Sequence, residues 1–308
     1  MPIIEIKYLI LAAFLLSVLY VHRRGKVRFS FGRQLFNHSS LLAPYNALMY
    51  LFSAVPSKPL LHEGIFPELA ALSANWQVMR DEALKLQDEG YIRIALNNND
   101  IGFNSFFKRG WKRFYVKWYD EPLASAQALC PKTVELLRKI PAVKGAMFAL
   151  LDPRSHLNPH RDPFAGSMRY HLGLVTPNAD TCFMSVDGER YFWKDGEAVL
   201  FDETYIHSVE NNTDETRIIL LCDIERPLTV GFMRAINSWV SRKIVTASAT
   251  QNLENEPVGA LNRFYGGVYH PIAAKMSAAA SSLKRRNRPL YRTLQYGLVL
   301  SAAYLIFV

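Results

Sequence analysis

The sequence predicts a mainly β domain with flanking helices, built on a double-stranded β-helix core of the jelly-roll, cupin-like kind, with a membrane segment at each end. Three observations predict this fold class. From residue 144 onward apolar residues recur with a period of two, and short runs rich in Gly, Pro, Asn and Asp separate these stretches. The most apolar segments lie at the two ends of the chain. Many short antiparallel strands at regular spacing favour two packed sheets, for which the jelly roll is a common arrangement.

The expected β elements follow two expected helices. Apolar residues at helical spacing predict helices over Phe66–Asp88 and Pro131–Lys139. Asp187-Gly188 lies between two alternating runs and is typical of a tight hairpin turn. Strands are expected at Gly145–Leu151, Met168–Thr176, Cys182–Val186, Glu189–Trp193, Ala198–Phe201 and Arg217–Ile224.

The 308 residues are long enough for one sizeable core and several additional segments. The polar stretch 247–257 is interpreted as a linker. The expected division is an N-terminal transmembrane anchor (1–22), a basic and interfacial connector (23–60), the jelly-roll domain (61–227), an amphipathic helix with a linker (228–288) and a C-terminal membrane segment (289–308).

The two ends have the composition of membrane segments. Residues 3–21 are almost wholly apolar, and the basic run 22–28 follows them, which favours a retained anchor over a cleaved signal peptide. A second basic run, 284–288, precedes the apolar tail 294–308, which is short for a full span and fits a partly inserted segment as well. The positive-inside rule then places the region between them in the cytoplasm. The alternative for each segment is a buried core helix.

The net charge of +9 and a pI near 9.4 indicate an anionic partner. No nucleic-acid-binding module is recognisable, so an anionic membrane surface is favoured and nucleic acid is not expected. Residues 41–52 and 231–243 suit a membrane interface, although a helix packed on the domain explains the second stretch equally well. The three cysteines are an odd number without metal-site spacing, which argues against a disulfide framework and a zinc site.

A metal site is predicted at His160, Asp162 and His207. Pro159 and Pro163 favour extended backbone, in which residues two apart point to the same side. His207 follows the expected strand that ends at residue 201. Two histidines and one carboxylate form the facial triad typical of non-haem iron(II) oxygenases. The alternative is a surface His-x-Asp sequence without a metal.

Basic residues accompany these ligands. Arg169 and His171 face the same side of one expected strand, and Arg217 begins the last one. Burying such groups unpaired is costly, and a metal-bound dicarboxylate gripped by an arginine would remove that cost. The alternative is that Arg169 and Arg217 pair with nearby acidic residues, namely Asp202, Glu203 or Asp223.

Several ordered motifs lie between residues 110 and 227: Gly110-Trp111-Lys112-Arg113-Phe114-Tyr115-Val116-Lys117-Trp118, Cys130-Pro131-Lys132-Thr133, Pro159-His160, Arg169-Tyr170-His171-Leu172-Gly173-Leu174, and Phe201-Asp202 followed by His207 and Arg217. This order resembles the aspartyl/asparaginyl β-hydroxylase family. The resemblance implies that His160 and His207 bind Fe(II), that Arg169, His171 and Arg217 hold the cosubstrate 2-oxoglutarate, and that O2 is the second cosubstrate. Residues 111–113 are expected near the substrate entrance.

Two positions depart from the family pattern. The animal peptidyl hydroxylases lack the carboxylate ligand that Asp162 supplies, and a family serine aligns with Ala149. The terminal apolar segments, Asp162 and the length look more like the bacterial lipid A hydroxylases. That resemblance implies hydroxylation of C2 of a secondary acyl chain, on lipid A or its acylated precursor, at the cytoplasmic face of the inner membrane.

The basic residues Arg23, Arg24 and 284–286 suit the phosphates of such a lipid. Two alternatives stay open: a membrane-anchored peptidyl Asp/Asn β-hydroxylase, and a non-catalytic jelly-roll module that binds an anionic ligand.

Overall fold

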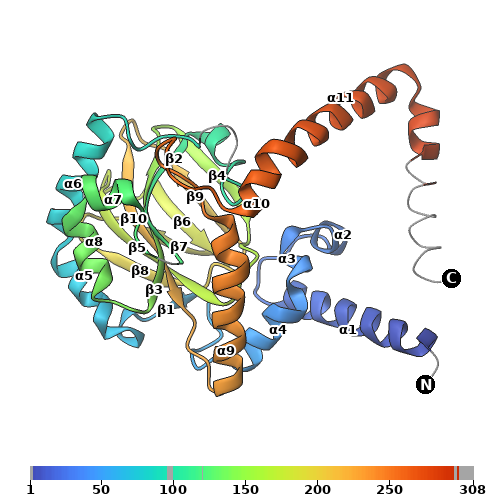
Figure 1. Ribbon diagram of the computed structural model, residues 1–308, viewed down its shortest axis with the longest axis horizontal. Helices are drawn as coiled ribbons and strands as arrows, with labels where there is room; N and C mark the ends of the chain where they lie inside the picture. Colours follow the sequence, from blue (N-terminus) through green and yellow to red (C-terminus); the bar gives the residue numbers. More distant parts are fainter. Residues whose placement is uncertain (1–2, 96–99, 120, 295–296, 298–308) are drawn as a thin grey trace.

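The computed structural model describes residues 3–95, 100–119, 121–294 and 297 and contains two antiparallel sheets that face each other (Figure 1). The larger sheet has the strand order β1-β8-β5-β10-β3-β2, and the smaller one has the order β4-β9-β6-β7. The predicted jelly roll is confirmed. Its strands are β1 (Leu60–Leu61), β2 (Trp111–Trp118), β3 (Val143–Leu151), β4 (Ser155–His160), β5 (Ser167–Val175), β6 (Cys182–Val186), β7 (Glu189–Phe192), β8 (Ala198–Phe201), β9 (His207–Asn211) and β10 (Arg217–Glu225).

All expected strands are present, with ends within a few residues of the prediction. Strand β2 was not predicted because four consecutive residues of it, 113–116, are buried, so its sequence shows no alternation. Strands β4 and β9 were not predicted either, because they are short and rich in polar residues. The hairpin between β6 and β7 is confirmed: Asp187 and Gly188 both have positive φ, 52° and 88°, as its two-residue turn requires.

Two apolar layers enclose the large sheet. Its inner face packs against the small sheet, and its outer face is covered by the helices on the left of Figure 1. The expected helix 66–88 is interrupted at Asn75, which separates two helices. The covering helices are α5 (Ala70–Ala74), α6 (Trp76–Asp88), α7 (Ala124–Leu129) and α8 (Pro131–Arg138), and single-turn helices lie at Glu63–Ile65, Pro67–Leu69 and Phe107–Arg109.

Helix α1 (Ile3–Arg23) leaves the domain at its N-terminal side. Its segment Ile6–Arg23 is long and apolar enough to cross a membrane, with a mean hydropathy of 1.5 and only 11% of its residues buried. That exposure fits the expected anchor and contradicts a buried core helix. The connector forms α2 (Phe31–Leu35), α3 (His38–Leu41) and α4 (Ala43–Leu51).

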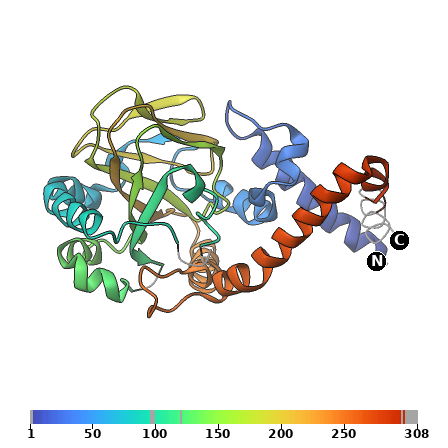
Figure 2. The same cartoon turned by 90° about the horizontal axis from the view of Figure 1, so that it is seen from above.

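The C-terminal part begins with α9 (Gly231–Val240), which continues as a π-helical turn, Ser241–Val245, and a single turn, Thr246–Ser248. After α10 (Ala260–Phe264) and a second π-helical turn (Tyr265–Tyr269) comes α11 (His270–Arg286). Helices α1 and α11 both extend away from the domain on the same side of it (Figure 1, Figure 2). The expectation that both basic runs lie on one side of a membrane stays a prediction. The predicted tail segment lies mostly outside the described residues.

The interpretation of residues 247–257 as a linker is wrong. Thr250, Asn252 and Glu256 are buried. The Asn252 side chain accepts a hydrogen bond from the Tyr115 backbone N–H and donates one to its carbonyl, at 2.8 and 2.7 Å. Glu256 accepts from the backbone N–H of Ser125 at 2.7 Å. Polar side chains that satisfy backbone groups of β2 and α7 therefore bind this segment to the domain, although its composition is that of a loop.

Candidate metal centre

A pocket opens between the two sheets and brings all six predicted site residues together. Its metal-binding groups come from the end of β4 and the start of β9, which pair through His160 and His207. Its basic groups come from β5 and β10. The lining residues are Phe103, Phe106, Trp111, Leu157, His160, Asp162, Arg169, His171, Phe201, His207, Val209, Arg217, Ile219 and Leu221.

The three predicted ligands converge as expected. The ligand atoms of His160, Asp162 and His207 all lie within 4.8 Å of one another, and His160 Nε2 is 3.8 Å from Asp162 Oδ1. The two imidazole ring centres are 4.2 Å apart. This set of two histidines and one carboxylate, with one side left open to the pocket, is the donor arrangement of a facial-triad metal site.

Backbone carbonyls fix both imidazole rings. His160 Nδ1 lies 2.7 Å from the carbonyl oxygen of Asn158, and His207 Nδ1 lies 3.0 Å from that of Tyr205. A carbonyl can only accept, so each Nδ1 carries the proton and each Nε2 keeps a free lone pair for a metal. Burial, with the neighbouring His160, lowers the pKa of His207 to about 3, and burial also lowers that of His160. Both rings are therefore neutral at physiological pH.

Arg169 holds the carboxylate ligand in place. Its guanidinium lies 2.8 Å from Asp162 Oδ2 and 2.9 Å from Asp223 Oδ1, so Arg169 bridges the two carboxylates. Burial alone would raise the pKa of Asp162, but attraction by the Arg169 guanidinium holds it below its ordinary value. The predicted alternative, pairing with a nearby acidic residue, thus holds for Arg169.

Arg217 and His171 are different because no carboxylate among the described residues pairs with either of them. Arg217 is buried, its Nε has no hydrogen-bond partner, and its guanidinium stacks on the Trp193 ring at 4.4 Å. Both ring nitrogens of His171 also lack partners. Burial lowers the pKa of Arg217 to about 10 and, with both arginines, lowers the pKa of His171 well below its usual value. Such a buried cation calls for an anionic ligand.

One wall of the pocket is aromatic, and the sequence predicts only part of it. Trp111 lines the pocket as expected, but Arg113 is buried against Asp100 and Lys112 pairs with Asp152. Phe106, whose ring centre is 4.7 Å from that of His160, and Phe103, stacked on Trp111 at 4.8 Å, were missed. The one sequence signal that could have indicated them is the cluster of phenylalanines at 103, 106 and 107.

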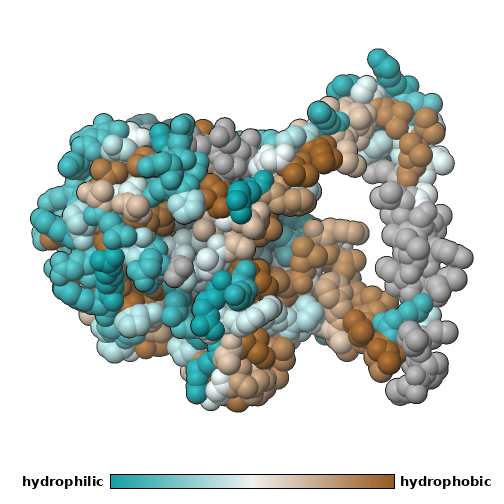
Figure 3. All heavy atoms as spheres, in the orientation of Figure 1, coloured by the Kyte–Doolittle hydropathy of each residue, from teal (hydrophilic) through white to brown (hydrophobic). Residues whose placement is uncertain are grey.

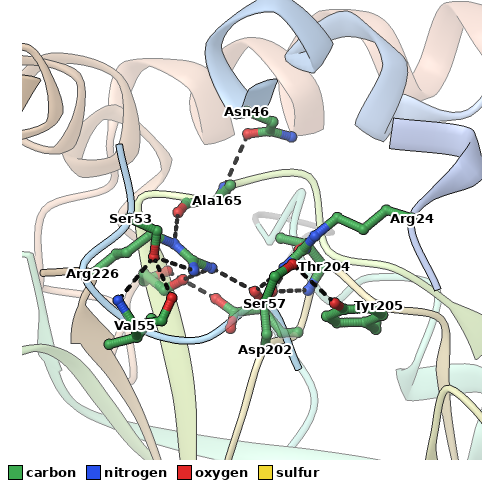
Figure 4. A network of polar contacts seen from close by, with 12 residues as sticks. Arg24, Asn46, Ser53, Val55, Ser57, Ala165, Asp202, Thr204, Tyr205 and Arg226 are labelled. Carbon is green, nitrogen blue, oxygen red and sulfur yellow. Dashed lines mark hydrogen bonds and ion pairs between the residues drawn. The ribbon is translucent and has the colours of Figure 1, made fainter. Parts of the chain in front are cut away.

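The chain that follows α1 is bonded to both metal-binding segments. Arg24 pairs with Asp202 at 2.6 Å and donates to Thr204, both in the loop that leads to His207 (Figure 4). Arg226 also contacts Asp202, at 2.8 Å. Arg161, between the two ligands of the His-x-Asp sequence, donates to the Val21 carbonyl at 2.6 Å. Arg24 is therefore buried, and the expectation that it faces lipid phosphates is wrong.

The jelly roll thus carries a pocket with a candidate metal site between its two sheets. The Aspartyl/Asparaginyl beta-hydroxylase family model matches residues 73–227, half of the chain. The chain belongs to this family.

Two relatives and one solved structure illustrate the similarity. The ornithine lipid ester-linked acyl 2-hydroxylase of Rhizobium tropici is 30% identical over 192 residues, which cover 61% of this chain and 68% of that protein. The human aspartyl/asparaginyl beta-hydroxylase is 26% identical over 211 residues, 67% of this chain but 26% of that protein. A crystal structure of a Pseudomonas putida prolyl-4-hydroxylase is 18% identical, covers 50% of this chain and 88% of that one, and has a TM-score of 0.35.

Proposed function

We propose that this protein is an Fe(II)- and 2-oxoglutarate-dependent dioxygenase that hydroxylates C2 of an acyl chain of a membrane lipid. The observation that carries the chemistry is that one pocket holds two neutral histidines and one carboxylate together with a buried arginine, Arg217, which has no acidic partner among the described residues. When bound, the iron supplies the redox chemistry that transfers one oxygen atom of O2 to a C–H bond while 2-oxoglutarate loses CO2.

The residues present fit these groups. Nε2 of His160, Nε2 of His207 and the Asp162 carboxylate are the ligands that an iron(II) ion takes. The Arg217 guanidinium, whose Nε has no hydrogen-bond partner, suits the far carboxylate of 2-oxoglutarate, and His171 lines the same pocket. In addition to any contact with the cosubstrate, Arg169 orients Asp162 through the ion pair between them.

The protein itself orients the metal ligands and excludes water from the pocket. The carbonyls of Asn158 and Tyr205 keep the proton on Nδ1 of each ligand histidine. Phe103, Phe106 and Trp111 make an apolar pocket wall, which excludes water from the reacting carbon and favours a hydrocarbon substrate over a charged peptide.

The substrate class rests on three supports. The Rhizobium tropici relative is named for acyl 2-hydroxylation of a lipid. One wall of the pocket is aromatic. Helix α1 is long and apolar enough to hold the enzyme at a bilayer, where an acyl chain is accessible. We propose lipid A or its acylated precursor as the lipid, at the cytoplasmic face of a bacterial inner membrane, because the basic run after α1 favours that side.

Peptidyl Asp/Asn β-hydroxylation is the second candidate, favoured by the human relative. Mass spectrometry of lipid A from a deletion strain, complemented with the wild type or with His160→Ala, separates the two. The lipid proposal requires one additional oxygen atom in lipid A with the wild type alone. Unchanged lipid A, together with an oxidised ornithine lipid, would keep the chemistry and replace the substrate. If no class of lipid changed in mass, the lipid proposal would be wrong.

A further inference from the structure

We propose that α4 and α9 form a bilayer-contacting surface that sets the height of the metal site above the membrane. This inference rests on the proposed membrane-lipid substrate and names the surface through which the enzyme meets it. The surface consists of Pro44, Leu48 and Leu51 on α4 and Phe232, Ile236 and Trp239 on α9; we call it the α4–α9 surface.

Each of the two helices has a face buried against the domain and, on another side, an exposed apolar stripe. Helix α4 buries Ala43, Asn46 and Met49, and α9 buries Met233, Asn237 and Val240. Packing on the domain explains these residues. It does not explain the second stripe on each helix, at positions i, i+4 and i+7, in which Leu51 is 72%, Phe232 is 59% and Trp239 is 55% exposed. The two sequence interpretations of α9, interfacial and packed on the domain, thus apply to different faces of it.

The α4–α9 surface continues onto the expected anchor. Tyr20 of α1 lies edge-on to Tyr50 at 6.1 Å between ring centres, and Phe52, directly after α4, lies edge-on to Phe232 at 6.0 Å. Figure 3 shows hydrophobic surface gathered along α9 and over α4 and α1, whereas the surface over α5 to α8 is mostly hydrophilic. A contiguous exposed apolar surface of this kind marks a contact site.

A lipid bilayer is the occupant that these features favour. Helix α1, which adjoins the surface, is the one described helix long and apolar enough to enter a membrane. Exposed Arg242 and Lys243 follow α9 and suit anionic headgroups, while Trp239 lies at the apolar edge, where interfacial tryptophans are found. A helix with an apolar stripe and basic residues at its end is typical of interfacial binding.

The buried faces of the same helices hold the metal loop. Residues 163–166 follow the ligand Asp162 directly. Asn46 of α4 donates to the Pro163 carbonyl at 2.8 Å and accepts from the Ala165 N–H at 3.0 Å. Asn237 of α9 donates to the Gly166 carbonyl at 3.0 Å. One loop therefore joins both helices to the metal centre, and a bilayer in contact with their outer stripes fixes the distance between lipid and pocket.

Fluorescence of Trp239 tests the proposal without any turnover. The full-length protein is reconstituted into vesicles of phosphatidylethanolamine and phosphatidylglycerol, and the Trp239 signal is obtained as the wild type minus Trp239→Phe. We expect lipids brominated high on the acyl chain to quench this signal strongly, and aqueous iodide to quench it weakly. The matched control is Trp76→Phe, because Trp76 is partly exposed on α6, whose surface is hydrophilic; bromolipids should not quench its signal.

Two outcomes would overturn the proposal. Quenching of Trp239 by iodide but not by bromolipid places the surface in water. Shielding from iodide that occurs only in native membranes, and not in the vesicles, assigns the surface to a protein partner. A further variant, Phe232→Ser with Ile236→Ser, should slow hydroxylation of lipid in vesicles several-fold but leave iron-dependent 2-oxoglutarate turnover in detergent unchanged. If that detergent turnover is absent in the wild type, the proposed chemistry fails while the fluorescence result stands.

Discussion

Arg217→Met separates the roles of the two pocket arginines, because only Arg217 lacks an acidic partner among the described residues. Burial lowers the pKa of Arg217 to about 10 from 12.5, so the folded protein disfavours its charged form. At about 1.4 kcal/mol per pKa unit, the substitution removes a penalty of at most about 3.5 kcal/mol at neutral pH. Methionine keeps much of the side-chain volume. We therefore expect the metal-free variant to be as stable as the wild type or more stable.

The same substitution should destroy cosubstrate binding. Loss of a buried, charge-assisted carboxylate contact costs about 2–5 kcal/mol, which is a decrease in 2-oxoglutarate affinity of roughly 30-fold to several thousand-fold. Urea unfolding of the metal-free protein and titration of 2-oxoglutarate into the iron-loaded protein measure the two effects.

Arg169→Met is the matched control, because it leaves Asp162 and Asp223 without their shared partner and should destabilise the protein by about 3–5 kcal/mol. If Arg217→Met lowered stability by a similar amount and left 2-oxoglutarate affinity unchanged, Arg217 would be a structural residue and the reasoning would be refuted.

Three further predictions concern the ligands, pH and the network beside α1. Asp162→Ala should abolish turnover and weaken iron binding; full activity would show that the two histidines suffice. Because the pKa values of His160, His171 and His207 are lowered on folding, the unfolded chain binds more protons below pH 6.5. The metal-free protein should then lose stability as the pH falls from 6.5 to 5.5, by about 1 kcal/mol for His207 alone, measured by urea unfolding; a flat profile contradicts this. Arg24→Ala should cost about 3 kcal/mol, since Asp202 keeps only Arg226, whereas Lys26→Ala, in an exposed pair, should cost under about 1 kcal/mol. Equal effects of the last two on thermal unfolding would rule out a structural role for the buried pair.

The local order of residues was sufficient to predict most strands and the metal ligands. A period of two reports which face of a strand is buried, so β5, β6 and β10 were predicted closely. The convergence of His160 and Asp162 was predictable because side chains two residues apart on an extended backbone point to the same side, which is a local relation. Strand β2 was missed for the same reason, since a strand buried on both faces has no alternation to detect.

The tertiary structure alone decided the partners of charged groups. Sequence placed Arg169 and Arg217 on the inner face, but which of them meets a carboxylate depends on β5 lying beside β10, where Arg169 is opposite Asp223. Likewise, Arg24 belongs to a basic run that suits lipid phosphates, yet it is buried against Asp202, which lies 178 residues further along the chain. Periodicity encodes burial of a face, whereas charge pairing requires the coordinates of segments that are distant in the chain. The sequence by itself therefore predicted the candidate metal ligands and most of their β scaffold, whereas only the fold shows that Arg217, unlike Arg169, has no acidic partner among the described residues.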